Sequence, residues 1–260
     1  MVEAKTLAED LRLAVSRVAF AHALGLHPDS WQEELLDSTS DRVLLNASRQ
    51  SGKSTCCALI ALHRAIYHPG SLILCLSPTL RQSGELFAKI TGFYQDLPNS
   101  ASVPTKVQRS DTLELENGSR VVSLPGDRPG VIRGYSAPAL VLVDEAAQCK
   151  DELIKALHPM LAVSKGRLFL ISTPFGMSGV FFEAYQERHR WHYIEAPASE
   201  CPRISPEYLE EQRVLLGEWF YEQEFLCQFK QDVHAVFSVS AVDRMVTPGR
   251  QSPFAGTAWG

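Results

Sequence analysis

The stretch that decides the fold begins at residue 42 and reads Arg42-Val43-Leu44-Leu45-Asn46-Ala47-Ser48-Arg49-Gln50-Ser51-Gly52-Lys53-Ser54-Thr55. Residues 42–46 predict a strand, and a helix is predicted from residue 53. The turn between them presents backbone N–H groups and a helix N-terminus to one point, which favours an anion there. Lys53 could reach the outer phosphates of a nucleotide, and the Ser54 hydroxyl suits Mg²⁺. The stretch therefore predicts a phosphate-binding loop, although Ala47 replaces its usual first glycine; the alternative is an ordinary loop that contains Gly-Lys-Ser.

A second motif closes another apolar strand, Leu140-Val141-Leu142-Val143-Asp144-Glu145. The carboxyl ends of such strands carry the ligand site in α/β sheets. Asp144 could hold the Mg²⁺ shell, and Glu145 could orient and deprotonate an attacking water. Two adjacent carboxylates at a solvated strand end are the alternative. That alternative loses weight because the two motifs follow each other in the expected chain order, each after an apolar strand.

A third motif, Ile171-Ser172-Thr173-Pro174, ends a further apolar strand. The hydroxyl of Ser172 or Thr173 could contact the γ-phosphate or its water and couple hydrolysis to movement. A Ser-Thr-Pro sequence is weak evidence by itself. Its position at the end of a core strand supports the assignment.

Alternating strand and helix signals predict an α/β fold with a mostly parallel sheet between helices. Strands are predicted at 42–46, 71–76, 139–143, 167–172 and 191–195, and helices from 53, 80, 151 and 178. The extra strand at 71–76 favours the additional-strand, catalytic-glutamate class of P-loop NTPases. Around Asn117-Gly118, residues 103–124 predict a hairpin inserted into this core.

Helices are also predicted at both ends of this core. Residues 7–24 place Leu7, Leu11, Val15, Val18 and Ala21 at helical spacing, and Ser30 with Glu33 predicts a capping box. A helical, lid-like region follows Ser205-Pro206-Glu207 and covers 206–229. We therefore expect an ATPase core at 1–200, a helical lid or linker at 201–237, and a linker at 238–260.

Composition excludes several classes of protein. With 45% hydrophobic and 21% charged residues, the 260-residue chain matches neither a disordered nor a fibrous protein. No apolar run approaches the roughly 20 residues that span a bilayer, and acidic residues interrupt the N-terminal region where a signal peptide would lie. The six cysteines lack metal-site spacing, so reduced thiols and a cytoplasmic location are expected. A net charge of −5 argues against a wholly basic surface without excluding a local basic track.

Together these motifs resemble the ATPase domain of the large terminase subunit, the DNA-packaging motor of tailed bacteriophages. The resemblance extends from about Trp31 to Phe237, and an arginine in the phosphate loop is itself typical of that family. Four stretches carry it: Ser48-Arg49-Gln50-Ser51-Gly52-Lys53-Ser54, Val143-Asp144-Glu145-Ala146, Ser172-Thr173-Pro174 and Tyr221-Glu222-Gln223-Glu224-Phe225-Leu226-Cys227-Gln228-Phe229.

The resemblance implies a set of nucleotide contacts. Gln32 matches a glutamine that contacts adenine, with a surface glutamine as the alternative. Arg49 would act near the phosphates of its own subunit beside Lys53 and Glu145, while Arg133 would be an arginine finger offered to a neighbouring subunit, with Arg128 as the alternative finger. The expected ATP-binding set is Gln32, Ser48, Arg49, Gln50, Ser51, Gly52, Lys53, Ser54 and Thr55, with Mg²⁺ held by Ser54 and Asp144.

The family also implies partners. These are double-stranded DNA, the portal protein, the small terminase subunit and further copies of the chain in a pentameric ring. Ser77-Pro78-Thr79 resembles a helicase-like coupling motif, with a plain strand-to-helix turn as the alternative. Candidate DNA contacts are Lys106, Arg109 and Arg120, each equally readable as a solvated charge. A nuclease domain usually follows the ATPase domain, and residues 254–260 look like its approach, so DNA cleavage is not expected from this fragment.

Two other functions remain open at this point. A superfamily 2 helicase shares the phosphate loop, the Asp-Glu pair and the Ser/Thr motif, but no second RecA-like domain is evident. A nucleotide-binding scaffold or ring protein without turnover is the second alternative. The intact Lys53 and Glu145 argue against it.

Overall fold

The fold is built on one eight-stranded sheet. A computed structural model describes residues 2–97, 103–126, 129–132 and 134–231. The strand order is β3-β4-β5-β2-β6-β7-β1-β8; from β5 onward in this order the neighbours pair in parallel, and the pairs β3-β4 and β4-β5 are antiparallel. The strands are β1 (Arg42–Ala47), β2 (Leu72–Ser77), β3 (Thr105–Gln108), β4 (Thr112–Leu115), β5 (Arg120–Pro125), β6 (Leu140–Asp144), β7 (Arg167–Ser172) and β8 (His192–Ala196).

The central strands form because they are short, continuous apolar runs that bury both faces. In β1, Leu44 packs against one hydrophobic cluster while Val43 and Leu45 pack against the other. All five strands predicted in the α/β core are present, and no boundary is shifted by more than one residue. The mostly parallel α/β fold is therefore confirmed.

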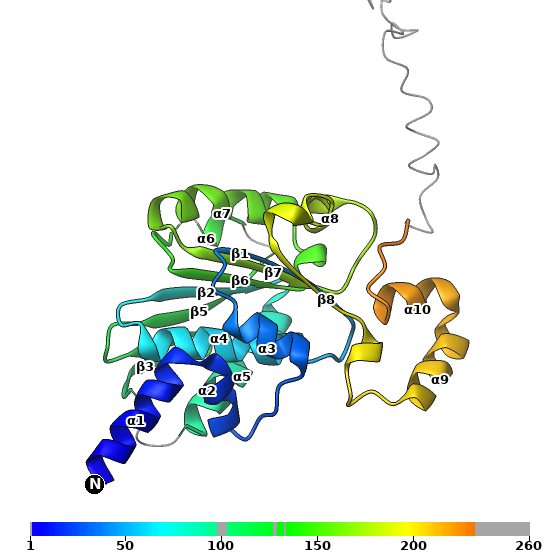
Figure 1. Ribbon diagram of the computed structural model, residues 1–260. Coiled ribbons are helices and arrows are strands. Elements are labelled where there is room, and N and C mark those ends of the chain that lie inside the picture. The colour runs from blue at the N-terminus through cyan, green and yellow to red at the C-terminus, as the bar shows by residue number, and fades with distance from the viewer. Residues whose placement is uncertain (1, 98–102, 127–128, 133, 232–260) are drawn as a thin grey trace, which may run out of the picture.

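Helices cover both faces of the sheet (Figure 1). Helices α1 to α5 contribute to the cluster on one face, and α6 to α8 contribute to the cluster on the other. The helices are α1 (Val2–Val15), α2 (Arg17–Ala23), α3 (Ser30–Asp37), α4 (Lys53–Tyr67), α5 (Leu80–Gln95), α6 (Pro129–Ile132), α7 (Asp151–Ser164), α8 (Gly179–Gln186), α9 (Pro206–Leu216) and α10 (Glu218–Glu224).

The predicted hairpin is confirmed at Asn117-Gly118, and the inserted segment joins the main sheet. Gly118 has a φ of 83° between β4 and β5, as a tight hairpin turn requires. β5 then pairs in parallel with β2, with Leu74 opposite Val122. The segment therefore extends the main sheet by three strands. This is possible because β5 is itself a buried, mostly apolar run, which can pair with the core strand β2.

Two predictions about the N-terminal helices are wrong in detail. Residues 7–24 form two helices, because the Ser16 hydroxyl accepts the Ala19 N–H and begins α2 afresh. The break changes the buried face, so Leu7 and Leu11 of the predicted stripe are exposed while Leu13 is buried. The next capping box is formed by Asp29 and Gln32, and not by the predicted Ser30 and Glu33, because the helix begins one residue earlier.

The C-terminal helical region lies beside β8 at one end of the sheet (Figure 1). Ser205 caps α9 as predicted, and its hydroxyl accepts the Tyr208 N–H at 3.2 Å. The single helical stretch predicted over 206–229 is wrong, since Gly217, with a φ of 76°, separates α9 from α10. The expected linker at 238–260 lies outside the described residues.

All six cysteines are buried and reduced, as expected. Burial raises the pKa of Cys56, Cys75 and Cys149 to about 12. In the described part of the chain, no helix combines the length and the hydropathy that crossing a membrane requires.

Candidate nucleotide site

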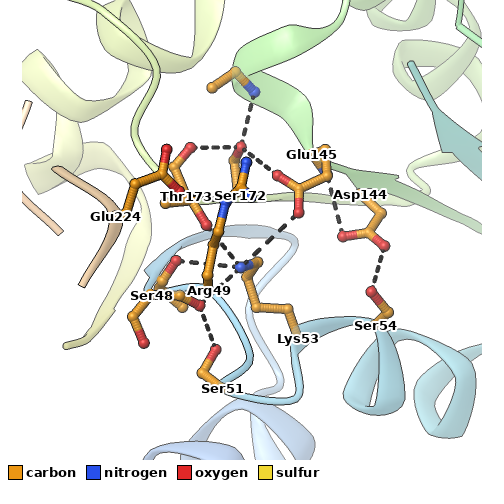
Figure 2. Close-up of polar contacts among 12 residues, drawn as sticks. Ser48, Arg49, Ser51, Lys53, Ser54, Asp144, Glu145, Ser172, Thr173 and Glu224 are labelled. Carbon is orange, nitrogen blue, oxygen red and sulfur yellow. Dashed lines mark hydrogen bonds and ion pairs between the residues drawn. The ribbon is translucent and has the colours of Figure 1, made fainter. Parts of the chain in front are cut away.

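The three predicted motifs meet at the carboxyl edge of the sheet. β7 lies between β1 and β6, with Asn46 opposite Ser172 and Asp144 opposite Ile171. Parallel pairing in this register aligns the three strand ends, so the loops that follow them share one site. Figure 2 shows Lys53, Glu145 and Thr173 turned toward one another there, with Asp144 turned toward Ser54.

The phosphate loop is held in shape by its own backbone and by Lys53. Gly52 has a φ of 97°, which glycine adopts at little cost, and it caps α4. The Lys53 Nζ donates to the Ser48 carbonyl at 2.9 Å and to the Thr173 hydroxyl at 2.8 Å. The Ser51 hydroxyl also donates to the Ser48 carbonyl, at 2.8 Å. The loop therefore has an ordered geometry with a buried ammonium group at its centre.

The two carboxylates have distinct surroundings. The Ser54 hydroxyl donates to Asp144 Oδ2 at 2.7 Å, and Asp144 is buried. Burial, followed by the charge of Glu145, raises the pKa of Asp144, because both disfavour its ionised form. Glu145 is partly exposed, and its Oε1 lies 3.9 Å from the Lys53 Nζ. Asp144 is thus placed next to Ser54, while Glu145 faces the space above the loop.

The predicted coupling residues, Ser172 and Thr173, contact Glu145 and Lys53 respectively. Ser172 Oγ lies 3.4 Å from Glu145 Oε2 and accepts the Ala147 N–H at 3.2 Å. Thr173 binds Lys53, as described above. The strand end at 172–173 therefore connects the residues of both main motifs.

Gln32 is buried at 6% exposure, so the alternative of a surface glutamine is wrong. Its Oε1 accepts the Asp29 N–H, and its Nε2 donates to the Ser51 carbonyl at 3.0 Å. Gln32 and Thr55 line a cavity of about 360 Å³ beside the loop, which Leu26, His27 and Arg203 also line. The adenine contact itself remains a prediction.

Sequence reasoning missed the contacts between the loop and the C-terminal helices. The Arg49 guanidinium forms an ion pair with Glu224, and the Arg49 N–H donates to the Glu224 carbonyl at 3.0 Å. The Asn46 amide donates to the Cys227 carbonyl at 2.8 Å. Both partners lie in the stretch 221–229 that carried part of the resemblance, which was the available signal.

A second cavity, of about 510 Å³, lies directly over the loop. Arg49, Gln50, Gly52, Lys53, Ser54 and Glu145 line it, together with three residues that sequence reasoning missed: Gln82, Lys89 and Gln148. Gln82 and Lys89 come from α5, where only their long-range placement identifies them. Arg133 and Arg128, the two candidate fingers, lie outside the described residues.

Comparisons with known proteins agree with this geometry. The family model described as "Terminase large subunit, T4likevirus-type, N-terminal" matches residues 44–244. The large terminase subunits of Thermus phage G20c and Thermus virus P23-45 are each 27% identical to the chain, over 84% of it. The chain spans about half the length of these curated relatives, 52% of each.

Solved structures show the same fold. The large terminase ATPase domain of Thermus phage P74-26 superposes with a TM-score of 0.69 at 23% identity, covering 81% of this chain and 97% of that one. The large terminase of a thermophilic bacteriophage, solved in complex with ADP, gives a TM-score of 0.63 at 13% identity, covering 78% of this chain and 54% of that one. The chain has the P-loop NTPase fold of these domains and belongs to the large terminase subunit family, in its N-terminal part.

Proposed function

We propose that the chain is a Mg²⁺-dependent ATPase motor domain of a viral large terminase, which drives double-stranded DNA into a procapsid. The observation that carries the proposal is the meeting of Lys53, the Ser54–Asp144 pair and Glu145 at adjoining strand ends. A scaffold that only held nucleotide would not need a carboxylate facing the space above the loop. The family and the fold support the same conclusion.

Lys53 and the N–H groups of the loop would hold the β- and γ-phosphates. Lys53 now binds carbonyl and hydroxyl oxygens, which a phosphate oxygen can replace as an acceptor. Glu145 would orient a water in line with the γ-phosphorus and accept its proton, as the bond to the ADP oxygen breaks. The products are ADP and inorganic phosphate.

The residues present fit a magnesium ion. Ser54 and Asp144 offer two oxygens 2.7 Å apart, and the raised pKa of Asp144 marks a buried carboxylate whose ionised form a cation would stabilise. Mg²⁺ commonly uses one or two protein oxygens together with phosphate oxygens and waters. Bound there, it would neutralise charge on the β- and γ-phosphates.

Coupling would pass through the strand end at 172–173 and through Arg49. Ser172 lies beside Glu145, and Thr173 binds Lys53. Loss of the γ-phosphate would change the surroundings of Glu145 and Lys53, and with them the contacts of the strand end. Arg49 joins the loop to Glu224, which would link the nucleotide to the lid that we propose at 201–237. The ATPase core would comprise 1–200.

The assembly is also a proposal. Family membership supports a pentameric ring at the portal, working with the small terminase subunit in the host cytoplasm. Arg133, or Arg128, would supply the finger to the neighbouring subunit's ATP. Among the candidate DNA contacts, Lys106 is paired with Glu114 at 2.7 Å, and Arg120 lies opposite Glu114 in the β4-β5 pair, so Lys106, Arg109 and Arg120 stay equal candidates.

The decisive experiment measures phosphate release from ATP with Mg²⁺ for the wild-type chain and for Glu145→Ala. We expect turnover in the wild type and a loss of at least about 100-fold in the variant, the range for a positioned general base. The variant should still bind ATP, because Lys53 and the loop are unchanged. Equal, near-zero release from both proteins at high concentration would end the enzyme assignment and favour a nucleotide-binding scaffold.

A further inference from the structure

Helix α5 contributes one polar face to the cavity over the phosphate loop. Gln82 and Lys89 are separated by seven residues, or about two helical turns, so they lie on the same side of α5. Both line the cavity of about 510 Å³ that Lys53 and Ser54 also line. α5 packs against α4, the helix that begins with Lys53, so this face is fixed relative to the loop.

Gln82 is oriented by the cap of α5. The Thr79 hydroxyl donates to Gln82 Oε1 at 2.8 Å, so the amide nitrogen is the group that Gln82 can offer to a ligand in the cavity it lines. Thr79 is the N-cap of α5, and it ends the Ser77-Pro78-Thr79 turn that begins at the last residue of β2. The donor on α5 is therefore connected directly to that strand-to-helix turn.

Lys89 differs from the other cations of the cavity in having no counter-charge. Lys53 donates to three oxygens of the chain, and Arg49 is paired with Glu224. In the described part of the chain, by contrast, Lys89 makes neither an ion pair nor a hydrogen bond, and its side chain is exposed. An ammonium group without a partner in a cavity built for phosphate is available to an anionic ligand.

We propose that Lys89 binds the terminal phosphate of ATP, with Gln82 as a second donor on the same helix. This assignment rests on the proposed function, because it needs ATP in the cavity. The terminal phosphate is favoured over the base because Lys89 shares its cavity with Ser54, Glu145 and Gln148. Gln32 and Thr55 instead line the separate cavity on the other side of the loop.

The assignment gives α5 a role in sensing the nucleotide. ADP lacks the group that Lys89 binds, so the contact exists only before phosphate release. The contacts of α5, and through the turn at 77–79 those of β2, would then differ between the ATP-bound and ADP-bound states. Discrimination between the two nucleotides is the property to measure.

The test compares the affinities of the wild-type chain, Lys89→Ala and Lys89→Arg for AMP-PNP and ADP by calorimetry with Mg²⁺. In Lys89→Ala we expect the Kd for AMP-PNP to rise about tenfold, as for a lost charge-assisted hydrogen bond, and the Kd for ADP to change less than about twofold. Lys89→Arg should stay within about threefold of wild type, because it keeps the charge.

The matched control is Arg81→Ala, which removes one positive charge from the same helix. Arg81 is exposed and paired with Glu85, and it does not line the cavity, so both affinities should change less than about twofold. An equal loss for AMP-PNP and ADP in Lys89→Ala, or no loss for either, would overturn the assignment. A wild-type chain that binds neither nucleotide would instead refute the proposed function, and the assignment with it.

Discussion

Replacing Gly52 by alanine tests how the phosphate loop is supported from beneath. Gly52 adopts a φ of 97°, where side chains other than glycine's are strained. A Cβ atom built there would lie 2.7 Å from the Gln32 Nε2. That nitrogen donates to the Ser51 carbonyl at 3.0 Å, so the new methyl group would push Gln32 away from the loop.

Two costs add in this variant. A residue held at positive φ costs about 1–3 kcal/mol. Displacing Gln32 leaves a buried amide or carbonyl without its partner, which costs about 1–3 kcal/mol more. We therefore expect Gly52→Ala to lower the free energy of unfolding by about 2–6 kcal/mol, and to weaken nucleotide binding because the loop must shift.

The assay is urea denaturation monitored by circular dichroism, with Gly70→Ala as the control. Gly70 also has a positive φ, of 72°, but an added Cβ meets no atom within 4 Å, so this variant reports the backbone cost alone. Gly52→Ala should be the less stable of the two by about 1–3 kcal/mol. In a Gln32→Ala background the clash is absent, so there Gly52→Ala should cost about as much as Gly70→Ala. If both glycine variants lose the same stability, the proposed support of the loop by Gln32 is wrong.

Two further predictions concern other contacts. His63 is buried beside Phe20, and burial lowers its pKa from 6.5 to about 4, so the unfolded chain takes up the proton first as the pH falls. The free energy of unfolding should therefore drop by up to about 3 kcal/mol as the pH falls from 6.5 to 4. Urea unfolding measured across this pH range should show the drop in the wild type and not in His63→Phe. The same pH dependence in both proteins would contradict the role of His63. Glu224→Gln should lower stability by less than about 1 kcal/mol, because Arg49 is 63% exposed, yet speed hydrogen exchange of the Arg49 N–H, which donates to the Glu224 carbonyl. The control Glu218→Gln breaks the pair with Arg213 within the helical region, and equal exchange at Arg49 in both variants would show that the loop is not tied through Glu224.

Local patterns predicted the elements that carry the chemistry. Each core strand is a short apolar run between turn residues; Asp144 and Ser172 end such runs, and Lys53 begins the helix that follows another. Parallel strands bring their carboxyl ends together, so the meeting of these residues follows from order along the chain. The predicted roles of the individual residues still await experiment.

The remaining features depend on contacts between residues far apart in sequence. Arg49 and Glu224 are joined across most of the chain, and Lys89 reaches the cavity only through the packing of α5 on α4. β5 follows the Asn117-Gly118 turn as a hairpin arm, and nothing local shows that β2 pairs with it. The break at Gly217 was missed because the helical signals on either side of it are continuous.

Because its thiols are buried, the folded chain should react only slowly with alkylating reagents. Only a thiolate reacts readily, and burial both raises the pKa and blocks access. Modification of Cys56 or Cys75 must therefore wait until α4 parts from the sheet. The rate of thiol labelling therefore measures how often that opening occurs. A nucleotide that stabilises the loop at the start of α4 should slow the labelling.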